Sequence, residues 1–113
     1  MAHRDLNMLE AADNVSDQVT ALVDRPGGRR MQHVRQMLES AQAIPANISE
    51  GFGRASQRDR ARVLRIARGE AEETIRHLGK NYRSRRIPAK DYWPIHNRLV
   101  VIVKMLNSFL SRY

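Results

Sequence analysis

The sequence contains no cysteine, which excludes disulfides and thiolate metal sites and leaves nothing that points to an oxidising compartment. It also lacks a long hydrophobic run. The longest aliphatic stretch, from Leu99 to Val103, is far too short to span a bilayer, and residues 1–5 lack the apolar segment of a signal peptide. We therefore expect a cytoplasmic protein with no membrane partner. Aromatic residues make up only 5% of the chain, so few side chains are available for stacking on bases.

The remaining composition is typical of one globular domain. At 113 residues the chain can bury a single core but not two independent ones, so residues 1–113 are expected to form one domain. Hydrophobic residues make up 42% and charged residues 28%, a balance that argues against a disordered chain. Strand-like alternation and hairpin signals are absent. Four helical segments joined by short loops predict an all-α fold, an antiparallel up-down-up-down four-helix bundle.

Hydrophobic spacing predicts the first two helices. Residues 6–23 place apolar side chains on one side and acidic side chains on the other, and the Arg-Pro-Gly-Gly segment at 25–28 should end this helix. A second helix is expected over about 30–52. Pro45 lies inside its pattern, so this helix either kinks there or breaks into two pieces. The register continues to Ile48 and beyond, which favours a kink.

The last two helices have similar sequence signals. Ser56 is a good N-cap and Asp59 stands three residues later, in the position of a capping box, so a third helix is expected over about 57–82. Its apolar stripe contains Val63, Leu64, Ala67, Ala71, Thr74, Ile75 and Leu78. The fourth helix should begin near Pro88 and continue to the C-terminus. Pro94 fits this helix only in or near its first turn.

Positive charge is unevenly distributed along the chain. The formal net charge is +8, but residues 1–50 carry five basic and seven acidic side chains, whereas residues 51–113 carry fifteen and five. Seventeen of the twenty basic residues are arginines, the type suited to planar, bidentate contacts with phosphate. A polyanion is therefore the expected partner.

One side of the third helix concentrates this charge. At 3.6 residues per turn, six basic residues fall within about 40° of one line, opposite the apolar stripe. This basic ridge consists of Arg58, Arg62, Arg65, Arg76, Lys80 and Arg83. Arg54 precedes it, and Arg85 and Arg86 follow it. A row that is basic along its whole length can follow a phosphate backbone and bind it in a salt-sensitive, largely sequence-independent way.

The alternative is an ordinary solvated helix face whose glutamates pair with neighbouring arginines. Residues 54–86 hold eleven basic and four acidic residues, so most of these arginines should lack a local partner. This excess favours contact with nucleic acid. Tyr82, Tyr92 and Trp93 lie close to the basic segment, where they could either stack on bases or belong to the core.

The fourth helix is apolar around most of its circumference. One face, suited to the bundle core, carries Ile95, Leu99, Ile102, Leu106 and Phe109. Val100 and Val101, with Met105 nearer Val101, point to other sides, so the helix should need a second apolar partner. We expect these three residues to form an oligomer interface. The alternative is a loop or the N-terminal arm that covers the valines.

Signals for catalysis or metal binding are weak. The four histidines are scattered, and the only pair at helical ligand spacing, Glu73 with His77, is too small for a zinc site and is expected to lie on the surface. The glycine-rich segment 51–56 follows a helix rather than a strand and lacks the Gly-Lys-Ser/Thr ending of a phosphate-binding loop. We expect no enzymatic activity, no catalytic residue, no metal and no cofactor.

Residues 43–56, Ala-Ile-Pro-Ala-Asn-Ile-Ser-Glu-Gly-Phe-Gly-Arg-Ala-Ser, resemble the signature of a bacterial four-helix-bundle family, Ile-Pro-x-Asn-Ile-x-Glu-Gly-(aromatic)-Gly-Arg-x-Ser. Members of this family include the proteins encoded in intervening sequences of 23S rRNA genes. The resemblance continues through residues 67–74 and covers roughly residues 41–80. It implies a structural role for Ile44, Pro45, Asn47, Ile48, Glu50 and Gly51.

The resemblance implies a four-helix bundle that assembles into a homopentameric ring with no known catalysis. A related branch, the accessory variability determinant of diversity-generating retroelements, is a basic pentamer that works with a reverse transcriptase and binds nucleic acid. Together with the basic ridge, this leads to the hypothesis of a non-catalytic, oligomeric nucleic-acid-binding protein, with RNA as the expected ligand. The rival hypothesis is a protein scaffold or accessory subunit that docks an acidic partner such as a reverse transcriptase.

Overall fold

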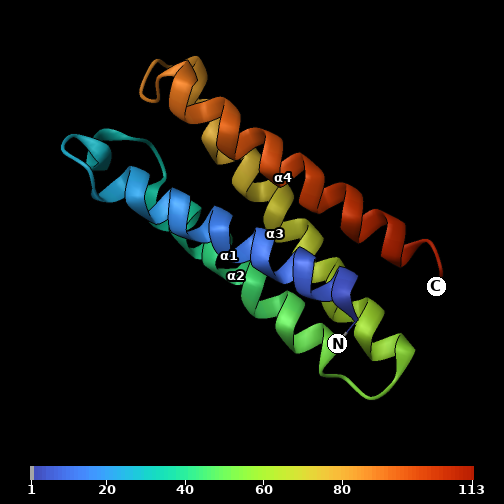
Figure 1. The fold of residues 1–113 in the computed structure, drawn as a ribbon. Helices are drawn as coiled ribbons and strands as arrows, with labels where there is room; N and C mark the ends of the chain where they lie inside the picture. Colours follow the sequence, from blue (N-terminus) through green and yellow to red (C-terminus); the bar gives the residue numbers. More distant parts are fainter. Residues whose placement is uncertain (1) are drawn as a thin grey trace.

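Four long helices account for most of the chain in the computed structural model, which describes residues 2–113. They are α1 (His3–Asp24), α2 (Val34–Phe52), α3 (Gln57–Arg83) and α4 (Ala89–Leu110), with a short 3₁₀ helix η1 (Gly28–Arg30) between the first two. The helices run antiparallel in an elongated bundle of 44 × 21 × 19 Å (Figure 1). The α1–α2 and α3–α4 loops lie at one end, and both termini and the α2–α3 loop lie at the other (Figure 1).

Each helix packs against two neighbours, because the contacts join α1 with α2, α2 with α3, α3 with α4 and α4 with α1. The predicted apolar stripe of α3 is buried throughout, apart from the half-buried Ile75. The predicted core face of α4 is likewise buried. Burial of these aliphatic faces is the main stabilising term of such a bundle, and the predicted four-helix architecture agrees with the structure.

Two glycines make the turn after α1. Gly27 adopts a left-handed backbone with φ of 82°, which a residue with a side chain rarely adopts. A Cβ at Gly28 would lie 2.2 Å from the carbonyl oxygen of Val23, so the chain passes directly over the last turn of α1. The chain therefore needs residues 28–33 to reverse, and α2 begins at Val34 rather than near Arg30 as predicted.

Helix α2 runs without a break from Val34 to Phe52 and contains Pro45, so the alternative of two shorter helices is wrong. The kink expected at Pro45 stays a prediction. Ile44 and Ile48, on either side of the proline, are fully buried. The side-chain amide of Asn47 donates to the carbonyl of Ala43 at 2.9 Å and adds a bond to the turn that contains the proline.

The end of α2 packs closely against α3. A Cβ at Gly51 would lie 2.8 Å from Cδ2 of Leu64, so a larger residue here would force the Leu64 side chain to move. Ser56 caps α3 by accepting a hydrogen bond from the Asp59 amide at 3.1 Å, as predicted. Pro94 is the sixth residue of α4, at the start of its second turn.

Candidate nucleic-acid interface

All six residues of the basic ridge are exposed on α3, so the helical wheel placed them correctly. Five of them have no carboxylate partner within residues 2–113: Arg58, Arg65, Arg76, Lys80 and Arg83. Unpaired guanidinium and ammonium groups keep their full charge available to an external anion. These five side chains are therefore the free cations of the ridge.

The ridge is not basic along its whole length, which corrects the prediction. Gly69 and Glu72 are exposed and fall on the same line of the helix, between Arg65 and Arg76. The ridge thus consists of two basic clusters, separated along the axis by about 17 Å at 1.5 Å per residue. The gap is readable from the sequence, because the same helical wheel places Gly69 and Glu72 on the line of the ridge.

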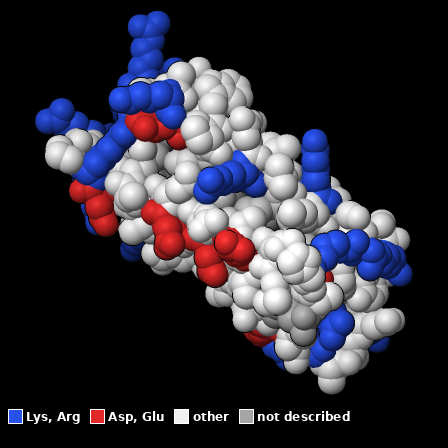
Figure 2. All heavy atoms as spheres, viewed as in Figure 1, with Lys and Arg blue, Asp and Glu red and all other residues white. Residues whose placement is uncertain are grey.

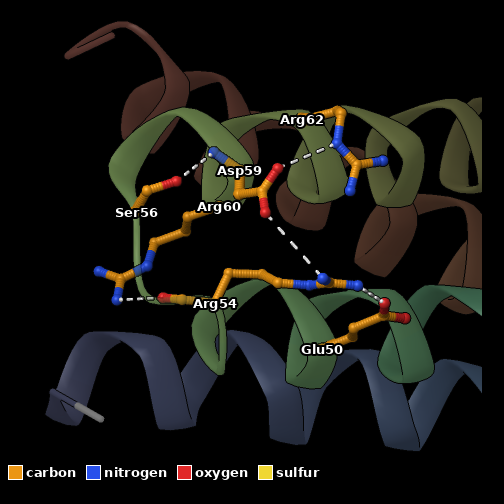
Figure 3. A network of polar contacts seen from close by, with 6 residues as sticks. All are labelled: Glu50, Arg54, Ser56, Asp59, Arg60 and Arg62. Atoms are coloured by element: carbon orange, nitrogen blue, oxygen red, sulfur yellow. Dashed lines mark hydrogen bonds and ion pairs between the residues drawn. The ribbon is translucent and has the colours of Figure 1, made fainter.

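Two of the predicted binding residues are engaged in a local network at the α2–α3 loop (Figure 3). Arg54 forms an ion pair with Glu50, one turn back on α2, and approaches Asp59 at 4.0 Å. Arg62 contacts the same Asp59 carboxylate at 3.4 Å. The carboxylate of Asp59 therefore serves two arginines rather than closing a capping box, and Arg54 and Arg62 carry less available charge than their neighbours.

Arg60 completes this network from the start of α3. Its guanidinium donates to the carbonyl of Arg54 at 3.2 Å (Figure 3). It also lies over the ring of Phe52, 6.0 Å from the centroid. These contacts hold the Gly-Phe-Gly-Arg segment against α3. In this chain, residues of the motif that carries the family resemblance thus take part in contacts between α2, the loop and α3, and the structural role expected for the motif stays a prediction.

Arg85 and Arg86 lie in the α3–α4 loop, at the far end of the ridge. This loop meets the α1–α2 loop, and Asn81 joins the two. The buried side chain of Asn81 accepts a hydrogen bond from the main-chain amide of Gln32 at 2.6 Å and donates one to the Gln32 carbonyl at 3.1 Å. The main-chain carbonyl of Asn81 accepts a hydrogen bond from the main-chain amide of Arg86 at 2.8 Å. Nε of Arg86 also donates to the Arg30 carbonyl at 3.2 Å.

Basic side chains gather at this end of the bundle (Figure 2). Three of those around the two loops, Arg29, Arg30 and Lys90, are exposed and were not among the predicted binding residues. Arg29 and Arg30 belong to the half of the sequence with a net negative charge, and Lys90 is isolated in the sequence. The position of Arg29 and Arg30 directly after a Pro-Gly-Gly turn could have identified them from the sequence, because the turns between helices lie at the ends of a bundle.

The aromatic residues near the ridge form a small stack. The rings of Tyr82 and Tyr92 are parallel, with centroids 4.2 Å apart, and Trp93 packs edge-on against both. Tyr92 is buried, and burial raises the pKa of its hydroxyl, an effect that the nearby Arg83 partly offsets. Trp93 is 45% exposed and is thus the aromatic side chain here that most readily reaches a ligand.

The predicted oligomer interface divides between two sides of α4. Val101 is 46% exposed beside Ala11 of α1, whereas the half-buried Val100 lines a groove with Ile75 of α3. Met105 is half-buried and packs against the core. The two valines therefore lie on different sides of α4, and no segment among residues 2–113 covers Val101.

Residues 2–113 contain no group of three or more side chains that could together hold a metal ion. Nε2 of His77 lies 3.4 Å from the Glu73 carboxylate, but His77 is half-buried rather than on the surface as predicted.

Burial and the neighbouring Glu73 raise the pKa of Glu70. None of the helices described here has enough consecutive apolar residues to cross a membrane.

The geometry defines a class: an all-α four-helix bundle with a two-part basic face on its third helix and a basic loop end. The chain belongs to the 23S rRNA-intervening sequence protein family, whose family model matches residues 4–108. It is similar to a solved protein of unknown function from the S23 ribosomal protein family of Bacteroides thetaiotaomicron. The two share 27% identity over 96% of this chain and 98% of that one, with a TM-score of 0.86. A comparison with curated proteins finds no match.

Proposed function

We propose that this protein is a non-catalytic, cytoplasmic nucleic-acid-binding protein, with RNA as its ligand, that contacts phosphates through the free cations of the α3 ridge. The observation that carries the proposal is the row of five exposed cations on α3 without a carboxylate partner in the described chain. From Arg58 to Arg83 this row extends about 38 Å at 1.5 Å per residue. A row of this length can contact several successive phosphates along one nucleic-acid strand.

The gap at Gly69 and Glu72 determines how such a ligand would bind. The two basic clusters contact two separate stretches of backbone, and the exposed Glu72 carboxylate keeps the strand away from the middle of the helix. Contacts to phosphate position a strand without reading its bases, so binding depends on salt and only weakly on sequence. Trp93 supplies one exposed ring on which a base can stack.

Assembly into a homopentameric ring is part of the proposal. The exposed Val101 and the groove beside Val100 support it, because an apolar side chain that nothing covers on the bundle is suited to contact a second copy. Five ridges on one ring would convert weak single contacts into strong overall binding. Light scattering on the purified protein measures the subunit number directly.

The test of the ridge is a triple variant in which Arg58, Arg65 and Arg76 are each replaced by glutamine. A control with the same loss of charge replaces Arg4, Arg35 and Arg112, which lie on three other segments. Both are titrated with a fluorescent structured RNA at several salt concentrations. The ridge variant should bind more weakly, and the slope of log K against log salt should fall by about 2, near 0.7 per lost single-strand contact.

An equal effect of the ridge variant and the control would contradict this assignment, as would salt-independent binding by the unmodified protein.

A protein scaffold that docks an acidic partner is the second candidate, favoured by one observation. Ile66, adjacent to the ridge on α3, is 44% exposed, and an apolar side chain beside a basic row is suited to a protein surface. Recovery of one defined protein in fixed ratio after nuclease treatment, with no RNA binding, would favour the scaffold.

A further inference from the structure

The loop end of the bundle contains a recess of about 530 Å³ between the α1–α2 loop and the α3–α4 loop. Its charged lining consists of Arg25, Arg30, Arg85, Arg86, Lys90 and Asp91. These residues come from two stretches of the chain, 25–30 and 85–91, and the two loops lie together at one end of the bundle, where Figure 2 shows many basic side chains. The volume falls within the range of about 300–1,000 Å³ that is usual for small-ligand sites.

The walls of this recess are held in place before any ligand arrives. Asn81 forms hydrogen bonds with the main chain of Gln32 in one loop and with the main chain of Arg86 in the other. The Arg86 side chain also donates a hydrogen bond to the carbonyl of Arg30. A site whose walls are fixed does not lose the free energy of ordering them when it binds. Two unsupported loops would lack this advantage.

The charge inside the recess is strongly unbalanced. Asp91 is the one carboxylate in its lining, and it forms an ion pair with Arg25. Arg30, Arg85, Arg86 and Lys90 have no acidic partner within the described residues. Four uncompensated cations around one hollow repel one another, and an anion bound among them would relieve this repulsion.

The glycines of the α1–α2 turn leave one side of the recess open. No atom lies within 4 Å of the position that a Cβ would take at Gly27, and Gly28 also lines the recess. A ligand can therefore contact the main chain of this turn in addition to the arginine side chains. A phosphate monoester matches this arrangement, since it carries nearly two negative charges and three acceptor oxygens, for which arginine offers paired donors.

We propose that this recess is a binding site for a phosphate monoester, either the 5′-phosphate of a nucleic-acid strand or that of a free nucleotide. No residue of the α3 ridge lines it. The site therefore stands whether or not the ridge binds RNA. An internal phosphodiester has one charge and two free oxygens, so the recess discriminates in favour of the monoester.

The experiment compares two short RNAs of identical sequence, labelled at the 3′ end, one with a 5′-phosphate and one with a 5′-hydroxyl. The recess variant is Arg30→Gln with Lys90→Gln, two exposed side chains with no partner among residues 2–113. The control, Arg4→Gln with Arg112→Gln, removes the same charge at the opposite end of the bundle. Fluorescence anisotropy gives the affinity of each protein for each of the two RNAs, and adenosine 5′-monophosphate serves as competitor.

The unmodified protein and the control should bind the phosphorylated RNA about tenfold more tightly than the hydroxyl RNA, and the recess variant should lose this preference. The ridge triple variant should weaken both RNAs and keep the preference, which separates the two sites. Competition by the nucleotide identifies a nucleotide site, and its absence identifies a strand end. Equal binding of the two RNAs by the unmodified protein, or a preference that survives in the recess variant, would overturn the proposal.

Discussion

Replacing Asn81 with alanine should destabilise the protein more than any other single exchange of a polar side chain on α3. Asn81 is fully buried, and its side chain makes three hydrogen bonds, two to the main chain of Gln32 and one to the carbonyl of His77 at 2.9 Å. A net value near 1 kcal/mol for each bond gives a loss of about 3 kcal/mol in the free energy of unfolding. For a chain of this size, that corresponds to a fall in melting temperature of roughly 10 °C.

Circular dichroism at 222 nm, with thermal and urea unfolding at one fixed protein concentration, measures this loss. The matched control is Asn97→Ala, because Asn97 is exposed on α4, has no side-chain hydrogen bond among residues 2–113, and gains the same helix propensity on mutation. The control should be neutral or slightly stabilising. A loss below about 0.5 kcal/mol for Asn81→Ala, relative to the control, would show that water replaces these bonds and would refute the reasoning.

Three further predictions follow from single positions. Gly28→Ala should lower the free energy of unfolding by about 2 kcal/mol or more, because its Cβ would meet the Val23 carbonyl; an unchanged melting temperature would contradict this close approach. Glu70→Gln should raise stability slightly at neutral pH. Burial and Glu73 raise the pKa of Glu70, so its ionised form is disfavoured in the fold, and the gain should vanish below the ordinary pKa of 4.5, where the carboxyl is protonated anyway. Val101→Asp should reduce the mass seen by light scattering without a large change in melting temperature, and an unchanged mass would exclude Val101 from any subunit contact.

Periodicity predicted most of the fold because the helices of this chain are long and amphipathic. The start and end of α3 agree with prediction to within one residue, since Ser56 provides a local capping signal and the apolar stripe is continuous. The start of α2 was wrong by four residues. Its position depends on how Gly28 passes over the end of α1 and on the bond between Asn81 and Gln32, which are contacts between segments far apart in the sequence.

The same distinction applies to the candidate site. The exposure of the ridge follows from 3.6 residues per turn and was therefore predictable. The pairing of Arg54 with Glu50 was less readable, because Arg54 lies in the loop after α2 and the i, i+4 rule holds only along a helix. The recess was not predictable, because Arg30 and Lys90 are sixty positions apart in the sequence and meet only when both loops arrive at one end of the bundle.

The packing order of the helices also explains why the acidic residues of the chain do not neutralise its basic face. Helix α1 carries five acidic residues and one arginine, and acidic side chains line it in Figure 2. It packs against α2 and α4, whereas α3 lies diagonally across the bundle. The bundle is 21 × 19 Å in cross-section, and charges in physiological salt are screened over about 8 Å. The carboxylates of α1 therefore have little effect on the potential at the ridge, so in the proposed function a polyanion would approach α3 and the loop end while α1 faces away from it.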